Sequence, residues 1–274
     1  MVKTEEIRTD VEKKIKRIIR WHEFADMDQQ NPHHHATLGD HMIIAANYVE
    51  DQSGIMWRNP LDGHALHIAA LFHDCGKPEK AKMRNGIMTY WGHADASAEK
   101  FLAATAAIPE IAEERWAISE WIRRHDDFIS YRDGVPTNHA FLREITPETV
   151  AEKIFERNVR FRQGLTDIQK RYLCRLAITG NSELFKGMTA EEALTLEENV
   201  LQAHPAERTG VAFYRDLMCL CKADAYAQAK SCEVNGVKYT REGKMAVFDK
   251  IATVIPEAQE IANRAVAQMK GGWS

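Results

Sequence analysis

The chain has 274 residues, enough for one large domain or for a domain with a helical extension, because single hydrophobic cores stop growing at roughly 250–300 residues. Hydrophobic residues make up 45% and charged residues 28% of the chain, which excludes the intrinsically disordered class. The formal net charge of −4 at pH 7 argues against a wide surface for long nucleic acid and favours a small anionic ligand.

The sequence carries no signal for a membrane or for secretion. No run of about 18 apolar residues occurs, and the first residues follow a charged helical pattern in place of the apolar segment of a signal peptide. The five cysteines form neither a CxxC pair nor an even disulfide framework, which indicates reduced thiols. We therefore expect a soluble, cytoplasmic protein without a membrane partner.

The first part of the chain predicts two amphipathic helices. Residues 4–21 place isoleucine and valine at spacings of three and four, with Lys and Arg on the other side. After a break at Asn31-Pro32, Thr37 can cap a second helix. Its apolar face contains Leu38, His41, Met42, Ala45 and Val49. His41 is thus expected on a buried side.

An unusual ending distinguishes the next helix. Its apolar run, residues 66–72, leads directly into His73-Asp74, and a Gly-Lys-Pro turn at 76–78 then stops it. Most buried helices end in a cap, whereas this one ends in two side chains that could bind a metal ion. Asn-Gly dipeptides in the segments 83–90 and 232–239 predict two small hairpins.

Helical periodicity covers most of the remaining chain and predicts an all-α fold with one or two hairpins. The expected helices are 94–107, 109–125, 147–162, 166–179, 189–203, 208–230, 241–254 and 256–269. The charged loop 126–146, with Gly134 and Pro136, could be a boundary or a lid.

Two further polar residues are expected to lie among apolar neighbours. His125 shares the buried face of its helix, and Asp224 falls on an apolar stripe with Leu217, Leu220 and Cys221. A buried carboxylate is costly unless it is paired or bound to a cation. His93 begins another helix after a Tyr-Trp-Gly sequence. Imidazole and carboxylate ligands together suit Mn, Fe, Ni, Co, Zn or Mg.

The order of these residues resembles the H…HD…D signature of the HD-domain superfamily of metal-dependent phosphohydrolases. His41 is followed by His73-Asp74 and, much later, by Asp224 within Lys-Ala-Asp-Ala. Three short segments are more specifically similar to the HD domain of bacterial tRNA nucleotidyltransferases. They are Gln-Asn-Pro-His-His-His at 30–35, His-Asp-Cys-Gly-Lys-Pro at 73–78 and Tyr-Trp-Gly-His at 90–93. No nucleotidyltransferase head with its Gly-Ser and paired-Asp motif precedes this region, so the resemblance implies a hydrolase that acts alone.

The resemblance implies a ligand set and a division of the chain. His41, His73, Asp74 and Asp224 match the ligands of one divalent ion, and His93 and His125 match those that complete a second site, with Asp74 as the bridge. The HD fold is expected at 31–230, with an unmatched helical insertion at about 133–206. A helix that packs on the core is expected at 1–30, and a hairpin with further helices at 231–274.

These features predict hydrolysis of a phosphomonoester or phosphodiester of a nucleotide or short oligonucleotide by metal-activated water. The residues expected to take part in catalysis are Asp74, Lys77, His93 and His125. For His93 and His125 direct contact with phosphate is an alternative to metal ligation, and for Lys77 a solvated turn lysine is an alternative to phosphate binding. An HD-like diiron oxygenase and a non-catalytic nucleotide sensor are the competing functions. The roles of His33, His34 and His35, the substrate, the metal and the oligomeric state stay open.

Overall fold

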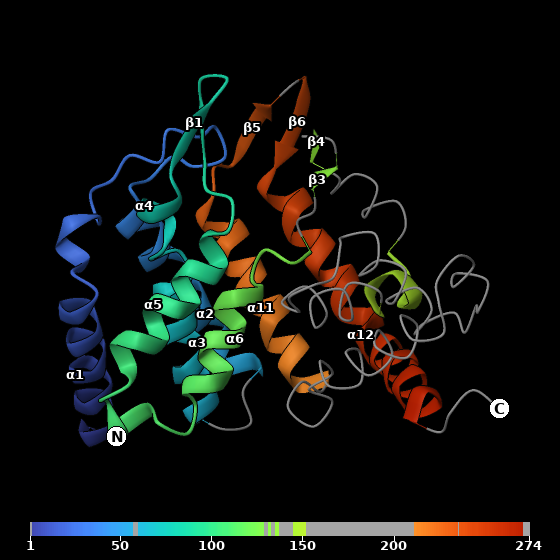
Figure 1. The fold of residues 1–274 in the computed structure, drawn as a ribbon, viewed down its shortest axis with the longest axis horizontal. Helices are drawn as coiled ribbons and strands as arrows, with labels where there is room; N and C mark the ends of the chain where they lie inside the picture. The colour runs from blue at the N-terminus through green and yellow to red at the C-terminus, as the bar shows by residue number, and fades with distance from the viewer. Residues whose placement is uncertain are drawn as a thin grey trace, which may run out of the picture. The chain divides into compact units, whose positions relative to one another are not determined.

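A computed structural model describes residues 2–56, 60–128, 131–132, 135–136, 145–151, 211–234 and 236–270 (Figure 1). Within these residues the fold is predominantly helical, and the strands form only short two-stranded hairpins. The predicted all-α class is therefore confirmed. No helix in the described part of the chain is long and apolar enough to cross a membrane.

The helices follow the predicted order with shifted ends. They are α1 (Val2–Ile18), the short 3₁₀ helix η1 (Trp21–Glu23), α2 (Leu38–Met56), α3 (Pro60–Phe72), α4 (Lys77–Lys80), α5 (His93–Thr105), the 3₁₀ helix η2 (Pro109–Ile111), α6 (Arg115–Arg124), α11 (Val211–Ala227) and α12 (Arg241–Lys270). The helices predicted at 166–179 and 189–203, and most of that at 147–162, lie outside the described residues.

Within the described residues, three antiparallel hairpins accompany the helices. β1 (Lys82–Arg84) pairs with β2 (Ile87–Thr89), and β5 (Ser231–Val234) pairs with β6 (Val237–Thr240). The first turns at the Asn-Gly dipeptide that predicted it, and both hairpins fall in the segments in which they were predicted. A third, β3 (Tyr131–Arg132) with β4 (Val135–Pro136), falls in the loop after α6 and was not predicted.

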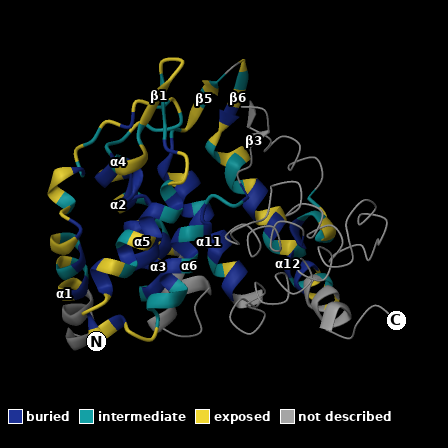
Figure 2. Ribbon diagram, in the orientation of Figure 1, coloured by how far each residue is buried: buried dark blue, intermediate teal, exposed yellow. Residues whose placement is uncertain are grey.

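The chain divides into two compact units, residues 1–126 with 216–248 and residues 127–215 with 249–274. In the first unit α3 packs against α2 and α6, and α5 packs against α6 (Figure 1). From Ala65 to Phe72 every residue of α3 is buried, as expected for a helix that is apolar on all sides (Figure 2). This helix brings His73 and Asp74 into the centre of the unit. In the second unit Ile251, Ile255 and Ala258 of α12 are buried.

Gly76 allows the turn after α3 to press against α5. A Cβ atom at this position would lie 2.4 Å from the backbone nitrogen of Ser97 and 2.7 Å from the carbonyl carbon of Ala96. Because Gly76 has no Cβ atom, its backbone amide can approach α5 and donate a 2.8 Å hydrogen bond to the Ser97 hydroxyl. Only glycine permits this approach, so the Gly-Lys-Pro sequence fixes where His73 and Asp74 lie relative to α5.

The segment between η1 and α2 is tied to distant parts of the first unit. Its Gln30 carbonyl accepts from the Met88 amide of β2, and the Asn31 amide side chain donates back to the Met88 carbonyl at 2.9 Å. The His33 carbonyl accepts from the amide of Ala229, just after α11. These bonds place His34 next to α2 and α4, and His33 next to the residues that follow α11.

One predicted helix boundary is wrong. The sequence predicted separate helices at 241–254 and 256–269, but α12 continues through Pro256. Proline removes one backbone donor and usually ends or kinks a helix. Here buried residues on both sides of it, Ile255 and Ala258, belong to one continuous apolar face. Packing of that face outweighs the lost hydrogen bond.

Candidate metal centre

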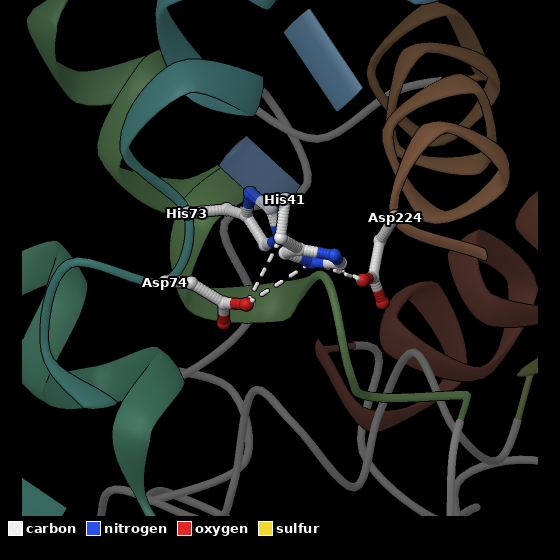
Figure 3. A group of neighbouring side chains, drawn as sticks. All are labelled: His41, His73, Asp74 and Asp224. Atoms are coloured by element: carbon white, nitrogen blue, oxygen red, sulfur yellow. Dashed lines mark ion pairs between the residues drawn. The ribbon is translucent and has the colours of Figure 1, made fainter. Parts of the chain in front are cut away.

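Four of the predicted ligands converge in the first unit. His41 comes from α2, His73 and Asp74 from the turn after α3, and Asp224 from α11 (Figure 3). Asp74 and Asp224 lie on opposite sides of the two imidazole rings. All four are buried, and one ligand atom of each lies within 4.8 Å of the others. These residues could hold a metal ion.

The distances within this group suit a single ion. The Nε2 atom of His41 lies 3.0 Å from Asp224 Oδ1 and 3.3 Å from Asp74 Oδ2. The Nε2 atom of His73 lies 3.3 Å from Asp74 Oδ2 and 3.6 Å from Asp224 Oδ1. Ligand atoms bound at 2.0–2.2 Å to one ion are separated from one another by about 3 to 4.4 Å. The four side chains therefore need little rearrangement to bind an ion.

A second group uses the other oxygen of Asp74. Asp74 Oδ1 lies 3.1 Å from His93 Nε2 and 3.6 Å from His125 Nε2, and the two nitrogens are 3.1 Å apart. His93 begins α5, and His125 follows α6. The Cys221 thiol of α11 donates to the His125 carbonyl at 3.0 Å, which joins the end of α6 to the helix that carries Asp224. Asp74 thus offers one oxygen to each group.

Three of the histidines are oriented by the same backbone contact. The Nδ1 atoms of His73, His93 and His125 lie 2.7, 2.9 and 2.7 Å from the carbonyl oxygen three residues earlier in the chain. Because a carbonyl only accepts, Nδ1 carries the proton and donates it. The Nε2 atom is then left free as a ligand, an arrangement typical of metal-binding histidines.

Several buried polar atoms of the centre lack a hydrogen-bond partner among the described residues. They are Nε2 of His41, Nε2 of His73 and Oδ1 of Asp74. A buried polar atom without a partner costs roughly 1–3 kcal/mol. In addition, neutral His93 and His125 would point two Nε2 lone pairs at each other across 3.1 Å. A divalent cation in each group would satisfy the atoms of that group, so the donor set fits a metal.

The charges of the centre support the same conclusion. Burial alone would raise the pKa of both carboxyl groups, but the neighbouring imidazoles, and Lys77 at Asp74, hold the pKa values of Asp74 and Asp224 well below the usual range. Burial would lower the pKa of His73, but the two carboxylates raise it to about 10. The pKa of His125 is raised against its burial, chiefly by Asp74. The raised pKa values of His73 and His125 favour positive charge at the place where a metal ion would supply it.

Lys77 is a buried part of the centre, so the alternative of a solvated turn lysine is wrong. Its ammonium group lies 2.6 Å from Asp74 Oδ2, donates to Gln29 Oε1 at 2.9 Å and lies 5.3 Å from the centre of the Tyr90 ring. The Tyr90 hydroxyl in turn donates to the Gln29 carbonyl at 2.5 Å. Lys77 therefore supports Asp74 from one side.

Sequence reasoning did not identify Gln29 or assign a role to His34. The His34 ring packs edge-on against His41 with 4.8 Å between ring centres, and its Nε2 lies 3.4 Å from the Lys77 ammonium. Burial lowers the pKa of His34 well below its usual value, so the ring is neutral and accepts from Lys77. His35 is exposed. The His-His-His sequence at 33–35 indicated that histidines could contribute to the site, but it could not show which ring faces the centre.

Comparison with protein families finds one match, to the HD domain, over residues 38–227. The matched range contains every residue of the two groups. Comparison with curated proteins and with solved structures gives no match. The more specific similarity to tRNA nucleotidyltransferases thus gains no support from these comparisons. Because the match spans more than half of the chain, the protein belongs to the HD-domain family of metal-dependent hydrolases.

Proposed function

We propose that this protein hydrolyses a phosphomonoester or phosphodiester of a nucleotide or short oligonucleotide with the help of one or two divalent metal ions. The observation that carries the proposal is that the two oxygens of Asp74 face different groups. Its Oδ2 atom faces His41 and His73, and its Oδ1 atom faces His93 and His125. A carboxylate in this position can bridge two ions.

The ligand roles follow from the two groups. His41, His73, Asp74 and Asp224 would hold the first ion, and Asp74, His93 and His125 would hold the second. A divalent ion supplies a water of lowered pKa and polarises a phosphoryl oxygen, so hydrolysis needs no protein nucleophile. This chemistry suits a site built from buried imidazoles and carboxylates.

The substrate would approach on the side of His93. The His93 side chain is 14% exposed, whereas those of His41, His73, Asp74 and His125 are at most 2% exposed. A phosphate at this side would meet the second group first. His93 and His125 would then either bind the ion or donate a proton to the leaving oxygen, and both roles require the positions that they occupy.

Lys77 would contribute positive charge. A phosphoryl transition state carries developing negative charge, which a fixed cation in a buried site stabilises. The ammonium group is already fixed by Asp74, Gln29 and His34. Because the side chain is 5% exposed, Lys77 would act chiefly by keeping Asp74 ionised and oriented.

The two competing functions make different predictions. Four histidines and two aspartates could also hold two irons for oxidative cleavage, so an HD-like oxygenase fits the same donor set. A nucleotide sensor with a degenerate site fits less well, since loss of a ligand would be the expected mark of degeneracy and all six predicted ligand residues are brought together here.

Metal analysis combined with a substrate screen tests the proposal. Purified protein should contain a transition metal in stoichiometric amount. With Mn, Fe, Ni, Co, Zn or Mg added, it should hydrolyse at least one of four substrate types: mononucleotides, cyclic nucleotides, triphosphates and model diesters. Oxygen consumption with iron bound would favour the oxygenase, and tight nucleotide binding without turnover would favour the sensor. Either result would contradict hydrolysis.

A further inference from the structure

A second layer of contacts fixes the carboxylate of Asp224. The Gln228 side-chain nitrogen lies 3.2 Å from Asp224 Oδ1 and 3.2 Å from Asp224 Oδ2. Gln228 is buried and lies four residues after Asp224, directly after the end of α11. Because the amide contacts both oxygens, it limits rotation of the carboxylate. Oδ1 is the atom that faces His41 and His73.

Lys244 determines which end of the Gln228 amide faces Asp224. The Lys244 ammonium donates to Gln228 Oε1 in a short hydrogen bond. An ammonium only donates and a carboxylate only accepts, so the amide oxygen must face Lys244 and the amide nitrogen must face Asp224. The amide dipole is therefore aligned between a cation and an anion.

Lys244 is itself fixed by the hairpin and by the segment before α2. Its ammonium lies 3.0 Å from His33 Nδ1 and 5.9 Å from the centre of the Tyr239 ring of β6. The His33 ring packs edge-on against Tyr239 with 5.0 Å between ring centres. Burial lowers the pKa of His33 to about 4, so the ring is neutral and can accept from Lys244.

The two carboxylates of the centre are thus supported differently. Asp74 contacts a lysine directly, with Lys77 at 2.6 Å, whereas Asp224 is linked to Lys244 through a neutral amide. The amide orients the carboxylate without neutralising it. In addition, His33 precedes the HD-domain match and Gln228 and Lys244 follow it, so this support comes from the flanks of the matched range.

We propose that Gln228 and Lys244 are positioning residues that act in series on Asp224 and raise the affinity of the centre for a divalent ion. The inference rests on the proposed function, because it requires that the centre binds metal. Gln228 orients Asp224 directly, and Lys244 acts through Gln228.

Calorimetric measurement of Mn²⁺ binding to the full chain, without substrate, tests the direct role of Gln228. Loss of a residue that orients a ligand typically weakens metal binding 10–100-fold. Gln228→Met keeps the length of the side chain and removes the amide, so we expect it to weaken Mn²⁺ binding about 10–100-fold. Lys244→Met should weaken binding by less, and Lys244→Arg should bind as wild type does, because it restores a donor to the amide oxygen.

The double variant Gln228→Met with Lys244→Met tests the series. If Lys244 acts through the amide, its removal has no further effect once the amide is gone, and the double variant binds Mn²⁺ as weakly as Gln228→Met alone. Additive losses would overturn the series arrangement.

Arg241→Met is the matched control. Arg241 donates a 2.6 Å hydrogen bond to the backbone carbonyl of Gln228. The variant therefore removes a contact of the same residue without changing the contacts of its side-chain amide. We expect Mn²⁺ affinity close to that of wild type. An equal loss in this control would show a general structural effect and overturn the inference.

The outcomes separate the inference from the proposed function. A wild-type protein that binds no Mn²⁺, Co²⁺ or Zn²⁺ overturns both. A wild-type protein that binds metal and hydrolyses phosphoesters, with Gln228→Met within twofold of its affinity and equal in thermal midpoint, overturns only the inference. If Gln228→Met does not fold, the Mn²⁺ affinities of Lys244→Met and Lys244→Arg are compared. Equal affinities of these two variants would overturn the inference.

Discussion

Asp74 has two oxygens with different surroundings, and its neighbours carry the protons that a metal ion would displace. His73 has a pKa raised to about 10 by Asp74 and Asp224, and the pKa of His125 is raised chiefly by Asp74. At neutral pH a metal must therefore compete with a proton on His73.

This competition predicts how metal affinity depends on pH. Between pH 6.5 and 8.5, below the pKa of His73, a rise in pH should strengthen Mn²⁺ binding by up to about tenfold per unit for each proton displaced. The sign is positive because the metal displaces the proton of His73, and fewer protons compete with it for this residue at higher pH. Calorimetry in buffers of different ionisation enthalpy measures both affinity and proton release. A constant affinity with no proton release would contradict these charges.

Gly76 provides a second prediction for a single residue. Gly76→Ala would place a methyl group 2.4 Å from the Ser97 backbone nitrogen, and backbone cannot move aside as a flexible side chain can. We expect a loss of about 1–3 kcal/mol in the free energy of unfolding.

Urea unfolding followed by circular dichroism measures this loss. Gly243→Ala is the control, because its added methyl group would meet only the side-chain hydroxyl of Thr240 at 2.9 Å. Equal stability of Gly76→Ala and wild type would show that the turn does not need the close approach to α5.

At the level of elements, α1 belongs to the first unit through one apolar face. Ile15 is fully buried, whereas Ile18, three residues later on the same helix, is 47% exposed. We expect Ile15→Ala to cost about 2–4 kcal/mol and Ile18→Ala less than about 0.5 kcal/mol. Thermal unfolding of the two variants measures the difference. Similar losses in both would contradict packing of α1 through this face.

Helical periodicity predicted the helices whose buried residues form one continuous stripe along the helix. On α2 the five residues of the expected face, His41 among them, are all buried, and on α11 Asp224 lies among buried neighbours as its stripe indicated. Such patterns are local in sequence and could be found from spacing alone.

Other features could not be predicted because they depend on contacts between distant segments. The Gln228–Lys244 contact joins the end of α11 to α12, and the Lys77–Gln29 contact joins residues 48 apart. No spacing rule connects such pairs. The continuation of α12 through Pro256 also depends on packing, which the local effect of proline concealed.

At the level of the whole molecule, the first unit is organised around its polar centre. The six residues of the two groups come from α2, α5 and α11 and from the ends of α3 and α6, so the site forms only when these helices are packed. The HD-domain match covers all of them. The family resemblance implied Asp74 as the bridge between two sites, and in the structure its two oxygens face the two groups.

The central claim is that Asp74 binds the metal needed for phosphoester hydrolysis, and a metal titration of activity tests it most directly. Metal-stripped wild type, Asp74→Asn and the control Asp40→Asn are compared with Mn²⁺ added stepwise and a model phosphodiester as substrate. Asp40 is exposed and immediately precedes His41, so its variant changes the same charge outside the centre. We predict saturable, Mn²⁺-dependent hydrolysis by wild type and Asp40→Asn, and a loss of at least about 100-fold in Asp74→Asn. Equal activity of Asp74→Asn and wild type at every Mn²⁺ concentration would contradict the account.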